Sequence, residues 1–279
     1  MKNKSKFINK FSLDKGMLKK KGQVTIFVII AVVVVGMIIL FFAFTDVGRD
    51  IIKPILPEGS TDASNVEEQL ESCIIDSEVL NTEIENILKQ GGNNDPSFFF
   101  LHQSIKMSYL CYSSDYYEPC VNQQPLLLQH VENEIKKSTI STISDCVQEL
   151  EKDLDRNGYE VQSDGYEVII DITQENINIK MDYPLRIKKG ESIQTFEGFE
   201  IKKPSEAYQL ILVSTSIIGF EANYGDSDPV TYMSLYPNTR VEKLKQGDGT
   251  TLYRISARDT LEEFNFATRS YAQPPGYGL

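Results

Sequence analysis

A long apolar stretch near the amino terminus constrains this chain more than any other feature. Residues 24–44 read VTIFVIIAVVVVGMIILFFAF, in which Thr25 is the only side chain with a polar group. As a helix rising about 1.5 Å per residue, they span roughly 31 Å, which matches a bilayer core of about 30 Å. A buried helix of a soluble domain would be shorter or show a polar stripe. A cleaved secretory signal would end in a small-x-small site, which residues 41–45 lack. The sequence therefore predicts a transmembrane helix over 24–44.

Charge gives this helix a direction. Residues 1–23 hold eight lysines and one acid, Asp14, for a net charge of +7. Because basic residues stay on the cytoplasmic side, the arm 1–23 is predicted to be cytoplasmic and the region after residue 45 extracellular. The arm is either a short amphipathic helix on the lipid surface or an unstructured tail. The whole chain carries −12, so residues 45–279 carry −19. Such an acidic region excludes nucleic acid as a partner.

Four cysteines, Cys73, Cys111, Cys120 and Cys146, all lie in the region predicted to be exported. An even number in an oxidising compartment favours two disulfides. Free buried thiols and a zinc site are the alternatives, but the gaps between the cysteines do not fit a zinc knuckle.

Helical periodicity suggests how these cysteines pair. One amphipathic helix begins near Val66 and ends at Gly91-Gly92, with Cys73 on its apolar face. A second helix runs from near Pro125 to Gly158 and also faces Cys146 inward. We therefore favour a Cys73–Cys146 bridge between the helices and a local Cys111–Cys120 bridge, although four cysteines allow three pairings.

The exported region divides by pattern into three parts. Residues 45–64 read as a linker, 65–157 as a helical part with the cysteines, and 158–279 as a sheet-rich part. The expected elements after Gly158 are a hairpin over 168–185, a strand over 196–201, a helix over 204–223, and strands over 241–245 and 251–256. The predicted fold class is α+β: an N-terminal transmembrane helix, then an exported, disulfide-containing helical region packed with antiparallel sheet.

One segment matches part of a calcium-binding loop. Asp153, Asp155 and Asn157 occupy positions 1, 3 and 5, Gly158 occupies position 6, and Asp164 occupies position 12. These are oxygen-bearing side chains and a glycine where an EF-hand loop requires them, although Asp replaces the usual bidentate Glu. The competing interpretation is a helix end capped by Asn157-Gly158. Calcium is the only cofactor that the sequence suggests.

Catalytic motifs are absent from the sequence. It contains no G-x-S-x-G, H-E-x-x-H, P-loop or G-x-G-x-x-G pattern. The histidines, His102 and His130, are interpreted as structural, and aspartates near 226–228 and at Asp248 as turn residues. An enzyme would have to use carboxylates, tyrosines or Arg269. Aromatic residues at 98–100 and 109–117 serve either the core or a partner-binding surface.

Residues 20–27, KKGQVTIF, resemble the class III (prepilin-type) signal of archaeal pilins, in which cleavage would fall between Gly22 and Gln23. Phe27 stands where pilins usually place a glutamate. More broadly, the chain resembles uncharacterised single-pass membrane proteins of small-genome archaea. That resemblance rests on GQVTIF, Glu71-Ser72-Cys73, Asp145-Cys146, Tyr183-Pro184-Leu185 and the segment FATRS at 266–270. It implies an anchored protein at an archaeal cell surface.

The function expected from the sequence is a structural or binding role in the cell envelope, without evident catalysis. Its partners would be the lipid bilayer and envelope proteins or further copies of itself. Two alternatives remain: a pilin-like filament subunit processed by a prepilin peptidase, and an envelope hydrolase that uses carboxylates.

Overall fold

The computed structural model describes Val34 and residues 65–274. The predicted arm 1–23, transmembrane helix 24–44, linker 45–64 and Gly22-Gln23 processing site therefore lie outside the described residues, apart from Val34. Residues 65–274 belong to one compact unit that spans Thr61–Leu279. Within the described residues, none of the helices has both the length and the apolar character needed to cross a bilayer.

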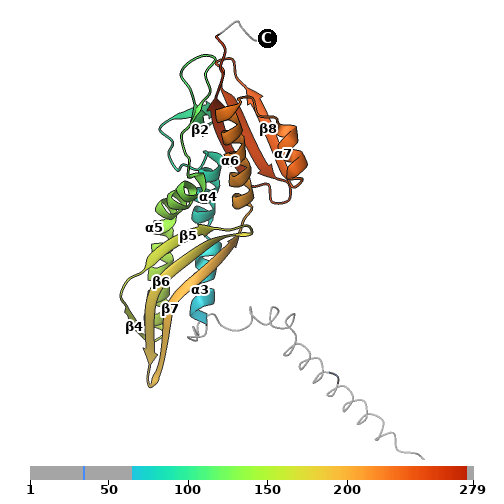
Figure 1. The fold of residues 1–279 in the computed structure, drawn as a ribbon. Helices are drawn as coiled ribbons and strands as arrows, with labels where there is room; N and C mark the ends of the chain where they lie inside the picture. Colours follow the sequence, from blue (N-terminus) through green and yellow to red (C-terminus); the bar gives the residue numbers. More distant parts are fainter. Residues whose placement is uncertain (1–33, 35–64, 275–279) are drawn as a thin grey trace, which may run out of the picture. The chain divides into compact units, whose positions relative to one another are not determined.

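Three helices form one side of the fold (Figure 1): α3 (Val66–Ile75), α4 (Glu78–Lys89) and α5 (Leu127–Arg156). The prediction of one continuous helix from Val66 to Gly91 was wrong at Asp76-Ser77. The hydroxyl of Ser77 accepts a hydrogen bond from the backbone N–H of Leu80, which starts a new helix. Since a capping serine within an amphipathic pattern leaves the apolar spacing almost unchanged, periodicity alone did not reveal the break.

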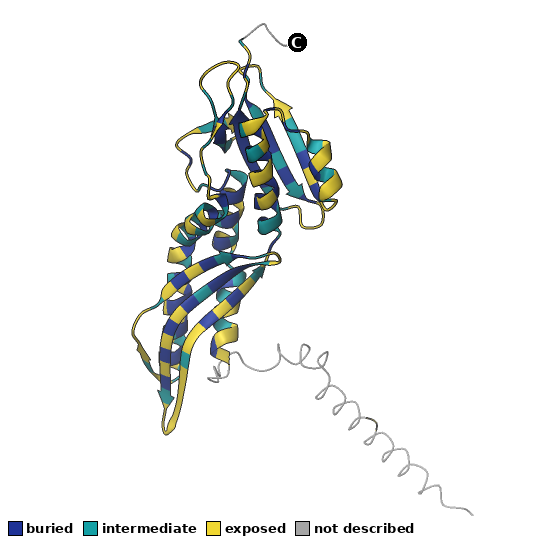
Figure 2. Ribbon diagram, in the orientation of Figure 1, coloured by how far each residue is buried: buried dark blue, intermediate teal, exposed yellow. Residues whose placement is uncertain are grey.

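The first sheet is built around one long strand. Its strands are β4 (Glu160–Ser163), β5 (Glu167–Ile172), β6 (Asn176–Lys189) and β7 (Ser192–Pro204). β6 pairs with β4 and β5 along one edge and with β7 along the other, always antiparallel. Buried residues alternate with more exposed ones along β5 and along β6 from Ile179 to Ile187 (Figure 2). The predicted hairpin over 168–185 and the strand over 196–201 are thereby confirmed.

The second sheet joins residues from both ends of the described region. Its strands are β1 (Phe99–His102), β2 (Ile105–Tyr112), β3 (Val121–Asn122), β8 (Thr239–Lys245), β9 (Thr251–Ala257) and β10 (Glu263–Arg269). β10 pairs antiparallel with β9 but parallel with β2. The second sheet is therefore mixed, whereas a wholly antiparallel sheet was predicted; the first sheet agrees with that prediction. The predicted boundary at 157/158 does not divide the fold, because β2 and β10 lie in one sheet.

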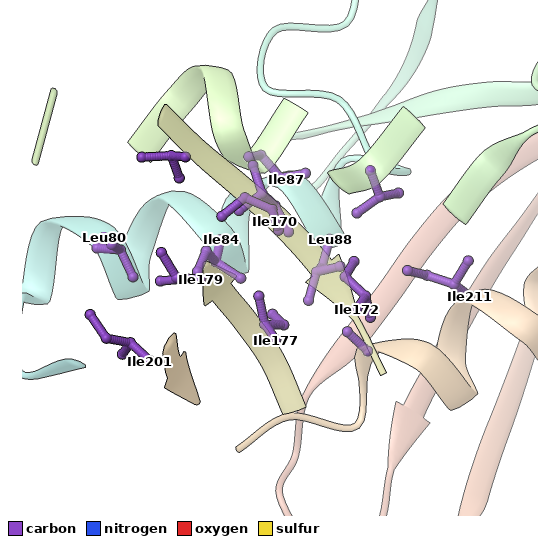
Figure 3. Packing of buried hydrophobic residues seen from close by; sticks show 14 of the residues in the cluster. Leu80, Ile84, Ile87, Leu88, Ile170, Ile172, Ile177, Ile179, Ile201 and Ile211 are labelled. Atoms are coloured by element: carbon purple, nitrogen blue, oxygen red, sulfur yellow. The ribbon is translucent and has the colours of Figure 1, made fainter. Parts of the chain in front are cut away.

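Two further helices, α6 (Ala207–Asn223) and α7 (Pro229–Leu235), accompany this second sheet. α6 packs against β9 and β10, whereas α7 packs against β8. One continuous apolar core connects the helices with both sheets. Figure 3 shows the part in which Leu80, Ile84, Ile87 and Leu88 of α4 gather with isoleucines of β5, β6 and β7. Burying each such side chain stabilises the fold by about 2 kcal/mol.

Both predicted disulfides are present. Cys73–Cys146 joins α3 to α5 with a Cα–Cα distance of 5.8 Å. Cys111–Cys120 joins β2 to the residue before β3 with a Cα–Cα distance of 5.3 Å. The pairing agrees with the helical periodicity that placed Cys73 and Cys146 on facing apolar stripes.

The turn after α4 requires glycine. Gly92 has φ +82° and donates its backbone N–H to the carbonyl of Ile87, which closes the end of the helix. A Cβ at this position would lie 2.6 Å from Cγ2 of Val131 in α5. The chain therefore passes close beside α5 here before it enters the segment that leads to β1.

Candidate functional site

Three aromatic rings gather where β1 begins and β2 ends. The ring centroid of Phe98, which precedes β1, lies 4.7 Å from that of Tyr109 and 4.7 Å from that of Tyr112. The two tyrosine rings meet edge to face at 5.1 Å. Both tyrosines are half-buried, whereas 46% of Phe98 remains exposed. The cluster thus has a packed base and an open aromatic face.

A hollow of about 170 Å³ lies beside this face. Its lining contains aromatic, amide, hydroxyl and apolar side chains: Asn93, Pro96, Ser97, Phe98, Ser108, Tyr109, Leu110, Gln123 and Gln124. None of these residues is an acid or a base. A neutral lining disfavours a charged ligand, because burying a charge without a counter-charge is unfavourable.

Three distant segments form the hollow. The first segment, after Gly92, contributes lining residues between Asn93 and Phe98, and the second is the part of β2 from Ser108 to Leu110. The third segment places Gln123 and Gln124 next to β2. The Cys111–Cys120 bridge and the β2–β3 pairing hold this third segment in place. The backbone N–H of Gln123 also donates to the carbonyl of Leu110 at 2.8 Å. The short disulfide therefore positions one wall.

Hydrogen bonds fix the base of the hollow. The Oδ1 atom of Asn93 lies 3.0 Å from Nε2 of His130, and its amide nitrogen donates to the Ser108 hydroxyl at 2.9 Å. With Asn93 Oδ1 as acceptor, Nε2 of His130 carries the proton. Burial lowers the pKa of His130, which favours the neutral imidazole. The Tyr109 hydroxyl bonds to that of Thr250 at 2.9 Å.

Arg269 supports the neighbouring loop. Its side chain is nearly buried, and its guanidinium carbon lies 5.9 Å from the Tyr112 ring centroid and 5.2 Å from that of Tyr116. Nε donates to the Asp248 carbonyl at 3.1 Å, and a terminal nitrogen donates to the Ser113 carbonyl. Arg269 therefore ties the segment between the two cysteines of the short bridge to the second sheet. It does not face the hollow.

Among residues 65–274, the most buried carboxylate is that of Glu221 at the end of α6, and its oxygens already have hydrogen-bond and ion-pair partners. It accepts the Tyr253 hydroxyl and the backbone N–H groups of Asp226 and Ser227, and Nζ of Lys243 lies 3.6 Å from it. Burial, with the adjacent Glu221 charge, raises the pKa of Tyr253 well above its usual range. These contacts give Glu221 a structural role, anchoring the loop after α6.

A second hollow, of about 340 Å³, collects acids between α4 and the β9–β10 turn. Each acid has partners: Glu85 pairs with Lys89, and Glu262 accepts the Glu206 backbone N–H and the Ser205 hydroxyl. Glu263 lies 3.8 Å from Nε of Arg254. Carboxylates used in this way stabilise the local structure, and the hollow has no histidine to assist them.

The calcium-loop residues do not converge. Asp153 and Asp155 lie in the last turn of α5, and Gly158, with φ +78°, ends the helix after Asn157. The Asp153 carboxylate bonds to Gln69 at 3.0 Å and to Arg156 at 2.7 Å. Asp164 follows β4. Across residues 65–274, no three His, Cys, Asp or Glu side chains form a group that could hold a metal ion. The geometry matches the capping interpretation.

The remaining polar residues singled out in the sequence occupy turns and strand ends. Asp228 caps α7, and Asp248 accepts the backbone N–H of Thr250. The Asp226 carboxylate lies 2.7 Å from Nζ of both Lys243 and Lys245. His102 is half-buried at the end of β1.

An apolar groove of about 350 Å³ separates the start of α5 from α6. Leu126, Leu128, Tyr208 and Leu212 form much of it, and Leu126 is 69% exposed. Its acid, Glu132, accepts the backbone N–H of Ile172, and burial raises the pKa of this carboxyl. The groove has too few free polar groups to orient a ligand.

Sequence reasoning found the aromatic residues but missed the polar ones beside them. Ser97, Gln123 and Gln124 belong to segments rich in neutral polar residues, NNDPS at 93–97 and NQQ at 122–124. These segments flank the aromatic residues and the short disulfide, and that composition was the available signal. No protein-family model, curated protein or solved structure matches the chain.

Proposed function

We propose that this chain is a single-pass membrane protein whose folded part, residues 65–274, faces outward and serves a binding role in the cell envelope. The observation that carries the proposal is the pair of disulfides in the folded part. Disulfides form and persist in oxidising surroundings. The lysine-rich arm and the uncharged stretch 24–44 supply an anchor with the matching direction.

A binding role is favoured over hydrolysis because Glu221 and the acids of the second hollow already have partners, whereas some neutral polar side chains beside Phe98 have none within residues 65–274. The carboxylates of Glu221, Glu262 and Glu263 are engaged by cations or hydrogen-bond donors. The neutral hollow beside Phe98 instead combines an exposed ring with side chains free to meet a ligand. Orientation by a few placed polar groups next to an apolar surface is typical of ligand sites.

Cysteine labelling in intact cells tests the location. Glu191→Cys places a thiol in the exposed β6–β7 turn, and Ser5→Cys places one in the arm. We expect a membrane-impermeant maleimide to label the first variant in intact cells and the second only after lysis. Labelling of Ser5→Cys alone in intact cells would refute the proposed direction.

Mass spectrometry of the native protein distinguishes the pilin-like filament subunit from a permanently anchored protein. A mature chain that begins at Gln23 would favour the pilin-like route, because cleavage after Gly22 follows the class III pattern. Retention of the lysine arm would exclude this route and agree with a permanently anchored protein.

A further inference from the structure

We infer that the hollow beside Phe98 binds a neutral saccharide, with one sugar ring on the Phe98 face and its hydroxyls bonded to Ser97 and Gln124. The inference deepens the proposed function and rests on it in one respect: an envelope or foreign saccharide meets only an outward-facing domain. The chemical basis is an aromatic face beside uncharged hydrogen-bonding groups.

The aromatic face is prepared in advance. Tyr109 and Tyr112 each lie 4.7 Å from Phe98, so the ring is held between neighbours while 46% of the residue stays exposed. The C–H groups on one face of a sugar ring carry partial positive charge, which suits the negative face of an aromatic ring. Because the phenylalanine is already fixed, little side-chain entropy is lost on binding.

The free polar groups have the chemistry that hydroxyls require. Within residues 65–274, the side chains of Ser97 and Gln124 make no hydrogen bond to another protein group. The Gln124 amide offers two N–H donors and one carbonyl acceptor. A sugar hydroxyl can accept a hydrogen bond from such an N–H and donate one to such a carbonyl. Gln123 donates through Nε2 to the Val121 carbonyl at 2.8 Å, which leaves its carbonyl oxygen available.

The other polar groups of the hollow are already used, which makes the base rigid. Asn93 is held by His130 and Ser108, and the Tyr109 hydroxyl is held by Thr250. Binding therefore needs no rearrangement of these side chains. Ligand specificity then comes from the side chains of Ser97 and Gln124, next to hydrogen-bonded side chains that stay in place.

Size and charge narrow the ligand further. The hollow measures about 170 Å³, which is below the roughly 300–1,000 Å³ of pockets that enclose drug-sized ligands and leaves room for about one sugar ring. Its lining has no Arg or Lys to meet a phosphate or carboxylate, and no Asp or Glu to meet a cation. A neutral sugar is consistent with both restrictions.

The test uses the full chain in a detergent without a sugar head group, immobilised on a biosensor. The probes are three tetrasaccharides, of β-1,4-linked glucose, α-1,6-linked mannose and β-1,4-linked N-acetylglucosamine, each titrated to 10 mM. We expect at least one to bind, with affinity at least tenfold lower for Phe98→Ala and roughly threefold to tenfold lower for Gln124→Ala. Leu261→Ala removes another exposed apolar side chain, one outside the hollow lining, and should bind as the native chain does.

Gln124→Ala guards against a folding artefact, since its side chain has no protein partner to lose. Absence of binding by the native chain, or equal binding by the native chain and both hollow variants, would overturn the inference. Phe98-dependent self-association without sugar binding would assign the surface to a second copy and overturn it too. The labelling experiment stays independent: sugar binding with inverted labelling would refute only the proposed location, and correct labelling without sugar binding would refute only this inference.

Discussion

The disulfide between α3 and α5 should stabilise the fold more than the one beside β2. Cys73–Cys146 spans a sequence separation of 73 residues, whereas Cys111–Cys120 spans 9. In the chain-entropy model, closing these loops in the unfolded state contributes about 4.5 and about 2.5 kcal/mol. The long bridge should therefore contribute about 2 kcal/mol more than the short one.

Paired alanine variants isolate this difference. Cys73→Ala with Cys146→Ala opens the long loop, and Cys111→Ala with Cys120→Ala opens the short one. Each pair removes two sulfur atoms from buried or partly buried positions, so the packing losses are similar. For a domain of this size, 1 kcal/mol lowers Tm by about 2–4 °C. We expect Tm to fall by roughly 9–18 °C for the first pair and roughly 5–10 °C for the second.

Thermal unfolding followed by circular dichroism, without reductant and in one detergent for all variants, measures both shifts. Adding reductant breaks both bridges of the native chain, so its Tm should fall below that of either unreduced variant. The Tm of each variant should fall only by the contribution of the one bridge that it retains. Equal shifts, or a larger shift for the short bridge, would contradict loop closure as the main source of stabilisation.

Two further predictions concern single residues. Gly92→Ala should lower the free energy of unfolding by about 2–3 kcal/mol, because the residue has positive φ and its new Cβ would lie 2.6 Å from Val131. Gly190→Ala has φ +62° but no neighbouring atom to meet, so it should lower the free energy of unfolding by only about 1 kcal/mol. If thermal unfolding shows Gly190→Ala to be the more destabilising variant, the contact with Val131 is not the cause. Burial lowers the pKa of His130, so the unfolded chain takes up this proton first as pH falls below about 6.5 and stability decreases. Urea unfolding between pH 7 and pH 5 should show a smaller decrease for His130→Gln, and an equal decrease would remove His130 as the cause.

The elements recovered from sequence are those with a strong local pattern. α5 carries its apolar residues at helical spacing, and β6 carries Ile, Met, Tyr or Leu at every second position from Ile177 to Ile187, so both could be recognised without tertiary information. The disulfide pairing followed from the same periodicity. By contrast, β2 and β10 pair in parallel over more than 150 residues of intervening chain. Nothing in a local window encodes such a contact.

The hollow was not predictable for the same reason. Its lining comes from segments around residues 93–98, 108–110 and 123–124, and only the fold brings them together. The aromatic residues alone allowed either a core or a surface interpretation. The structure gives them both roles, since Tyr109 completes a packed base while Phe98 stays exposed.

The short disulfide connects stability with the proposed site. Because the Cys111–Cys120 bridge closes a loop of only 9 residues, it stabilises the fold less than the Cys73–Cys146 bridge does. A contribution to stability is therefore a weak explanation for the position of this bridge. It lies, however, where β2 must hold the segment that carries Gln123 and Gln124. If positioning that wall is its role, the Cys111→Ala, Cys120→Ala variant should lose saccharide affinity at temperatures well below its Tm. The Cys73→Ala, Cys146→Ala variant, although less stable, should keep that affinity, because its bridge lies between α3 and α5, outside the hollow lining.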